Sequence, residues 1–302
     1  MASSSSSSSD DLPTYLSIVS DTKNKTKMSS LIRKGRESIK SDPNWVNRIL
    51  SSNDCNKYIY LLVKNFIKDG SAIVYGDSIL PSDSSDKGIL MNQFIRYVTQ
   101  ESKKSINRIY AMINSPSESR DISHQNWICL EFKNGSFENL TRFEPSNWYE
   151  EEFRIQSTCI EIIRTLFSSF RHLSDDDVSS FITTDEKAFG LNKISGCRLF
   201  STILASLHVT GIPLSNLTSL IKWKNRKCTQ QNSFGYEVNN QIKEYIEDKI
   251  DDRPARRLSR SANHSFSFIT KKSKSARKTP AKKKSKKKSV RKSKKTPKKS
   301  KK

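Results

Sequence analysis

A histidine, an acidic residue and a cysteine occur along this chain in an order that suits nucleophilic catalysis by a thiol. His124 precedes one apolar run, Glu144 follows the next, and Cys197 comes directly after a Ser-Gly pair at the start of a third. In such chemistry an imidazole takes the thiol proton, an acceptor orients the imidazole, and the thiolate attacks a carbonyl carbon. Cys197 is therefore the candidate nucleophile, His124 the candidate base and Glu144 the candidate orienting group.

Two strands and a tight turn would bring the histidine and the acid together. The runs 126–132 and 137–143 flank the dipeptide Asn134-Gly135, a strong signal for a β-hairpin. Pairing outward from this turn places His124 opposite position 145. Either Glu144 or Asn147 would then lie beside the imidazole ring.

The segment after the cysteine has the spacing of a buried helix. Residues 198–208 carry apolar side chains three and four positions apart, and Gly211 and Pro213 end the pattern. The N-terminus of a helix favours a negative charge and so lowers the pKa of a thiol. This position suits a reactive cysteine.

Each candidate also has a purely structural interpretation. A cysteine at a helix start is often a small buried hydrophobic residue. The histidine could be a solvated surface residue, and Glu144 could simply pair with Arg142. The acidic run 175–177 is better explained by capping of a helix than by a metal. The five cysteines are scattered without a Cys-x-x-Cys pair, so we expect reduced intracellular thiols, no metal and no cofactor.

The apolar patterns together predict an α+β fold, in which a small antiparallel sheet with a β-hairpin is flanked by helices. Helices are predicted near 30–40, 89–105, 149–170, 198–208 and 238–250, strands near 71–75, 107–113, 126–132 and 137–143, and a helix or strand at 57–67. We expect a disordered serine-rich segment 1–28, a helical region 29–105, an α+β core 106–250 and a disordered basic tail 251–302.

The C-terminal residues 253–302 carry the net charge of the chain. They hold 23 of its 54 Lys and Arg and no Asp or Glu, so the preceding residues carry 31 charges of each sign. A polycation binds polyanions because each neutralised phosphate releases a condensed counterion. We predict binding of nucleic acid without sequence preference by the tail's basic residues, among them Lys271, Lys272, Lys282, Lys283, Lys284, Lys286, Lys287, Lys288, Arg291, Lys292, Lys298 and Lys299.

Two features bear on the partner and on location. The units TPAK (279–282) and TPKK (296–299) resemble the S/T-P-K-K units of linker-histone tails, which implies duplex DNA rather than RNA. A nuclear localisation signal is the alternative interpretation of the tail. The N-terminus has neither a basic segment followed by an apolar one nor an apolar run of membrane-spanning length, so we expect no secretion and no membrane partner.

Two families have similar motifs. A histidine, an acid and then a cysteine heading a buried helix resemble the SUMO-protease and adenovirus-protease group of cysteine peptidases, and HQNWICLEF (124–132) resembles their His-Trp strand. The run LTRFEP (140–145) resembles uncharacterised proteins of large nucleocytoplasmic DNA viruses, iridoviruses among them, where Lys/Ser-rich tails also occur. Together the two resemblances cover residues 107–210. They imply a viral protein located in the virion and in the cytoplasm or nucleus of the infected cell.

The chain departs from the peptidase pattern in three ways. Arg198 follows the cysteine where those peptidases usually have glycine, and their oxyanion-hole glutamine is absent, which leaves Asn192 as the candidate substitute. The spacing from His124 to Trp127 is also longer than usual. Two hypotheses stay open: a cysteine-peptidase-like body, active or inactive, that acts on protein substrates and carries a DNA-binding tail, and a non-enzymatic virion or chromatin-associated scaffold that condenses DNA.

Overall fold

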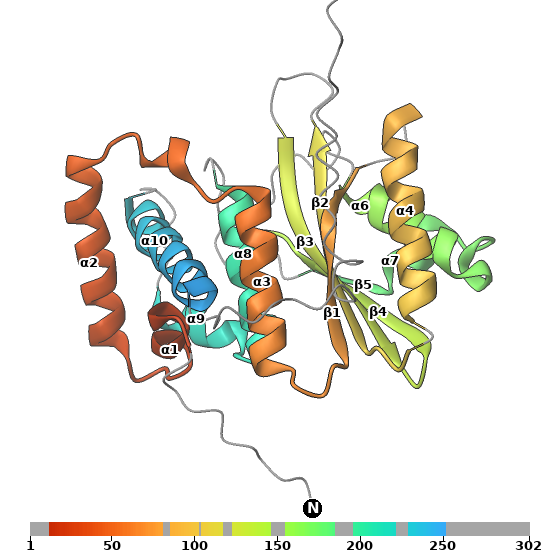
Figure 1. The fold of residues 1–302 in the computed structure, drawn as a ribbon, viewed down its shortest axis with the longest axis horizontal. Helices are drawn as coiled ribbons and strands as arrows, with labels where there is room; N and C mark the ends of the chain where they lie inside the picture. The colour runs from red at the N-terminus through yellow and green to blue at the C-terminus, as the bar shows by residue number, and fades with distance from the viewer. Residues whose placement is uncertain are drawn as a thin grey trace, which may run out of the picture. The chain divides into compact units, whose positions relative to one another are not determined.

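The fold is seen in a computed structural model, in which a five-stranded sheet lies between two groups of helices (Figure 1). The residues that the structure describes are 12–80, 85–102, 104–116, 123–145, 155–184, 196–221 and 229–251. They all belong to the compact unit Met1–Arg260. Of the segments predicted to be disordered, 1–28 and 251–302, residues 1–11 and 252–302 lie outside the described part. Residues 12–28 correct the prediction, because they contain the helix Thr14–Val19 and the start of the helix Lys25–Ser41. The predicted α+β class is confirmed.

The sheet is mixed rather than antiparallel, which corrects the prediction. Its strands lie side by side in chain order: β1 (Ala72–Ile79), β2 (Arg108–Pro116), β3 (Ser123–Lys133), β4 (Ser136–Phe143) and β5 (Ile182–Thr184). The middle three are antiparallel, but β1 runs parallel to β2 and β5 runs parallel to β4. A helix between two neighbouring strands returns the chain to the same end of the sheet and so permits parallel pairing.

The predicted β-hairpin is confirmed. Asn134 and Gly135 have φ angles of 53° and 77°, as a two-residue turn of the hairpin type requires. Lys133 pairs with Ser136 across the turn, and the register shifts between Glu131 and Phe132, at a β-bulge or irregularity. The turn therefore sets which residues of β3 and β4 meet at the far end of the hairpin.

Helices cover both faces of the sheet (Figure 1). The group on one side contains α1 (Thr14–Val19), α2 (Lys25–Ser41), α3 (Ser52–Phe66), α8 (Cys197–Thr210), α9 (Leu214–Leu220) and α10 (Thr229–Asp251). On that side α10 and α2 lie further from the strands than α3 and α8. The other group contains α4 (Ser85–Glu101), α6 (Ile155–Leu166) and α7 (Asp175–Ser179). Short 3-10 turns occur at Trp45–Arg48 and Ser168–Phe170. In the part of the chain that the structure describes, no helix combines the length and apolarity needed to cross a membrane.

Most helix predictions are confirmed, with shifted ends. The segment 57–67 is helical, within α3, and α10 begins well before the predicted start at 238. The helix predicted at 149–170 is shorter, since α6 ends at Leu166, and residues 146–154 are outside the described part. The predicted regions 29–105 and 106–250 both contribute strands to the one sheet, through β1 and β2.

Alternating side chains on the strands build two cores. On β2, Tyr110 and Met112 join the core on the side of α3 and α8, whereas Ile109, Ala111 and Ile113 join the core on the side of α4 and α6. This period of two is what a strand buried on both faces requires. The central strands are therefore held from both sides, which makes β3 a rigid support for polar residues near its start.

A buried serine on α8 connects that helix to two strands. Trp127 and Phe143 form a paired position near one end of the β3–β4 ladder. Ser201 Oγ accepts a hydrogen bond from the Trp127 backbone N–H at 2.6 Å and donates one to the Phe143 carbonyl at 2.8 Å. The next residue, Thr202, accepts the Trp127 indole N–H at 3.0 Å. Cys197 lies one helical turn before Ser201, so it faces the same strands.

We expect Ser201→Ala to destabilise the protein by about 1–3 kcal/mol, because it leaves a buried backbone N–H and a buried carbonyl without their partner. Chemical denaturation measures the loss. Ser219→Ala is the matched control, since Ser219 is an exposed helical serine whose hydroxyl bonds a nearby carbonyl of its own helix. Equal effects of the two substitutions would show that the serine bridge does not contribute.

Candidate active site

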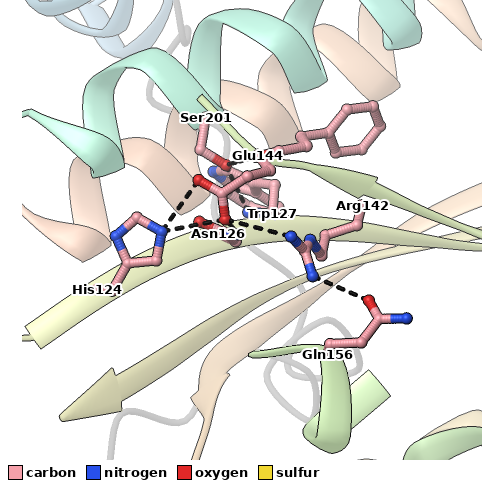
Figure 2. Close-up of polar contacts among 8 residues, drawn as sticks. His124, Asn126, Trp127, Arg142, Glu144, Gln156 and Ser201 are labelled. Carbon is pink, nitrogen blue, oxygen red and sulfur yellow. Dashed lines mark hydrogen bonds and ion pairs between the residues drawn. The ribbon is translucent and has the colours of Figure 1, made fainter. Parts of the chain in front are cut away.

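The histidine and the acid predicted to meet across the hairpin do so. His124 lies near the start of β3 and is 5 % exposed, while Glu144, just after β4, is 4 % exposed. The Nε2 atom of His124 lies 3.1 Å from each carboxylate oxygen of Glu144 (Figure 2). The Asn-Gly turn thus places a buried carboxylate beside the imidazole, although the register is set partly by the bulge.

Two further buried side chains hold this carboxylate. Asn126, on the same face of β3 as His124, donates its amide to Glu144 at 2.5 Å. The guanidinium of Arg142 lies 3.7 Å from Glu144 and donates to Gln156 of α6 at 2.9 Å (Figure 2). Burial raises the pKa of Glu144, but the contacts with His124, Asn126 and Arg142 outweigh this effect and lower it. Glu144 is therefore ionised at neutral pH.

The candidate nucleophile is the first residue of α8. Cys197 is half-buried, whereas Cys55, Cys129 and Cys159 are fully buried. Its sulfur interacts with the His124 ring and accepts backbone N–H groups of Gln125 and Arg198. Because Glu144 occupies Nε2, the Nδ1 atom of the ring is the one available to the thiol. The order along the site is thus thiol, imidazole, carboxylate.

The charges of this group support one another. Burial alone would lower the pKa of His124, but Cys197 and Glu144 favour the imidazolium and raise it to about 10. Burial raises the pKa of Cys197, but the hydrogen bond and positive charge of His124, with the two backbone N–H groups, lower it. Both shifts favour the thiolate–imidazolium form of the Cys197–His124 pair.

The side chain of Arg198, the residue after the candidate nucleophile, makes two hydrogen bonds. Its guanidinium bonds to the side-chain oxygen of Gln125 and, at 2.8 Å, to the carbonyl of Leu50. These bonds join the start of α8 to β3 and to the segment before α3. Arg198 thus helps to hold the start of α8, and with it Cys197, beside the strand that carries His124.

The remaining predicted site residues fall outside the described part of the chain. These residues are Asn147, Asn192 and the basic residues of the tail. Sequence reasoning missed Asn126, Gln125 and Ser201. Asn126 had a usable signal, since it lies two residues after His124 and so on the same face of a strand. Within the described ranges, no group of His, Cys, Asp and Glu is suited to hold a metal ion, and residues 175–177 lie in the first turn of α7, where Asp177 and Ser174 form a capping box.

Comparison with known proteins gives no relative. No family model matches the chain, and neither a curated protein nor a solved structure matches it. Function is therefore inferred from the geometry of the site.

We expect Cys197 to react with iodoacetamide at pH 6 at least about tenfold faster than it does in a His124→Asn variant, because an ordinary thiol with a pKa near 8.5 is almost fully protonated there. The rate in the unaltered protein should fall only as the pH drops through the lowered thiol pKa. Both rates should converge in alkaline solution, where either thiol is ionised. Mass spectrometry of the alkylated peptides measures both profiles.

His208→Asn is the matched control for this experiment. His208 lies on α8 and bonds the hydroxyl of Tyr110 at 2.9 Å, away from the cysteine. The control should keep the reactivity of the unaltered protein. An unchanged rate in His124→Asn would show that the imidazole does not activate the thiol.

Proposed function

We propose that the folded body is a cysteine hydrolase that cleaves a peptide or isopeptide bond. The observation that carries the proposal is the interaction of a half-buried thiol at the start of α8 with an imidazole whose other nitrogen is held by a buried carboxylate. Thiol, base and orienting acid in that order are the requirement for nucleophilic thiol catalysis.

The same geometry supports a two-stage reaction. The Cys197 thiolate attacks the carbonyl carbon, and the imidazolium of His124 donates its proton to the departing amine as the C–N bond breaks. Neutral His124 then takes a proton from water, which attacks the thioester and releases the acid and the thiolate. Backbone N–H groups in the first turn of α8 are suited to stabilise the oxyanion, and Asn192 remains the predicted side-chain donor.

The basic tail adds a second activity to the proposal. Residues 253–302 would hold the body on nucleic acid, with duplex DNA favoured by the linker-histone-like units. The R-F-E-P run and the tail together favour a protein of a large DNA virus, which would act in the virion or the infected cell. Substrates bound to the same nucleic acid would then be concentrated near the thiol.

A non-enzymatic scaffold is the second candidate function. The observation that favours it concerns Arg198, the residue after the cysteine. Its side chain bonds Gln125 and Leu50 and so has a structural role. In that case the tail would condense DNA and the body would serve as an interaction module.

Peptides that carry a C-terminal electrophile separate the two candidates. A library of peptide vinyl sulfones should label Cys197 covalently, and labelling should be lost in Cys197→Ala and strongly reduced in Glu144→Gln, because a neutral amide no longer supports the imidazolium. Intact-protein mass spectrometry measures the adduct. A thiol that reacts with iodoacetamide but with no member of the library, together with no cleavage of peptide or isopeptide substrates, would favour the scaffold.

Removal of residues 253–302 should make the salt dependence of DNA binding much shallower. Each lost phosphate contact reduces the slope of log affinity against log salt concentration by about 0.9. Fluorescence anisotropy with a labelled duplex measures that slope. The control is a variant whose tail keeps its composition but has its sequence shuffled, since it should keep the full slope. A truncated chain with an unchanged slope would contradict the role of the tail.

A further inference from the structure

Helix α2 carries a row of cations on one stripe of its surface. Lys25, Arg33, Arg36 and Lys40 are spaced by eight, three and four residues, and Ser29 fills the gap in the row. Side chains three or four residues apart lie above one another on an α-helix. All four cations are exposed, so the row forms a continuous positive ridge on the folded body.

These cations are unpaired within the described part of the chain. Lys34 of the same helix pairs with Glu237 at 2.9 Å, which raises the pKa of Lys34, but the structure gives no ion pair to the four residues of the row. The acidic residue of α2 is Glu37, which lies one turn after Arg33 and is also exposed. The row therefore keeps an excess of positive charge.

The helix is held firmly with this row facing outward. A different face of α2 buries Met28, Leu31 and Ile32, and the helix packs against α10, outside which it lies in Figure 1. The two helices approach so closely at Gly35 that a Cβ atom there would lie 2.0 Å from the carbonyl oxygen of Ser233. A ligand on the outer face thus meets charges fixed on a rigid helix.

We propose that the row on α2 binds the phosphodiester backbone of nucleic acid, as a contact of the folded body in addition to the basic tail. At a rise of about 1.5 Å per residue the row extends over roughly 22 Å, which is the rise of about six base pairs. Lys and Arg are the usual donors to phosphates, and Ser29 adds a hydroxyl donor. The inference does not depend on the activity of the Cys197 site.

The composition of the exposed face favours nucleic acid over a membrane surface. An amphipathic helix that inserts at a membrane needs large apolar residues beside its cations. Here the apolar residues of α2 are buried or half-buried, and its exposed positions hold Lys, Arg, Glu, Ser and Thr alone. The surface can neutralise phosphates but has nothing to insert into lipid.

The test compares two charge-matched variants of the full chain. One replaces the row (Lys25→Gln, Arg33→Gln, Arg36→Gln and Lys40→Gln). The other removes two lysines and two arginines that are exposed elsewhere on the body (Lys64→Gln, Lys68→Gln, Arg96→Gln and Arg171→Gln). The row variant should reduce the slope of log affinity for a DNA duplex against log salt concentration by roughly 3–4, at about 0.9 for each contact. The control should leave the slope nearly unchanged.

Lysine footprinting gives an independent readout on the unaltered protein, so that the result does not depend on the folding of a variant. Bound DNA should protect Lys25 and Lys40 from acylation and should leave Lys64 and Lys68 reactive, as measured by mass spectrometry. Equal slopes for the two variants together with unprotected α2 lysines would overturn the proposal. So would a row variant that loses binding to vesicles of anionic lipid but keeps its affinity for DNA.

Discussion

The position of the thiol depends on one hydroxyl group of α8 that is hydrogen-bonded to two neighbouring strands. Ser201 bonds both Trp127 of β3 and Phe143 of β4, at the end of their ladder. Apolar contacts are non-directional, so they set the position of a helix on a sheet less specifically than hydrogen bonds do. The two hydrogen bonds fix the position of α8, because a shift would leave buried backbone groups unpaired. Cys197, one turn earlier, is thereby fixed against the strand that carries His124.

The polar groups around the thiol form a series of ionisable side chains. Arg142, Glu144, His124 and Cys197 follow one another in space, and the pKa shifts favour the charged forms of Glu144, His124 and Cys197. Buried charges are costly to desolvate, and a paired set is seldom more stable than apolar residues of similar volume. Perturbed pKa values of this kind cluster at functional sites. The arrangement is therefore a weak source of stability and marks a candidate functional site.

The parts of this site that sequence could predict are those fixed by local geometry. The Asn134-Gly135 turn sets the pairing of its two strands, and so the meeting of His124 with Glu144 followed from counting residues. The helix after Cys197 followed from its apolar spacing. The parallel strands at the edges of the sheet could not be predicted in the same way, because the sequence of a crossover helix does not show in which direction the next strand pairs. Ser201 was hidden for a related reason, since a single hydroxyl in an apolar helix has a role only once its partners on the sheet are known.

The separation of the two proposed surfaces has a mechanical consequence. The cationic row belongs to α2, which packs on α10, whereas the thiol belongs to α8, which packs on α3 and β3. Helix α10 contacts both α2 and α8, so the two surfaces are joined through a packed helix and not through a shared loop. A packed helix of this kind, held closely to α2 at Gly35, has little freedom to move when phosphates bind. Nucleic acid bound to α2 would therefore hold the folded body near targets on the same nucleic acid and raise their local concentration. The reactivity of Cys197 would still be set by His124 and Glu144.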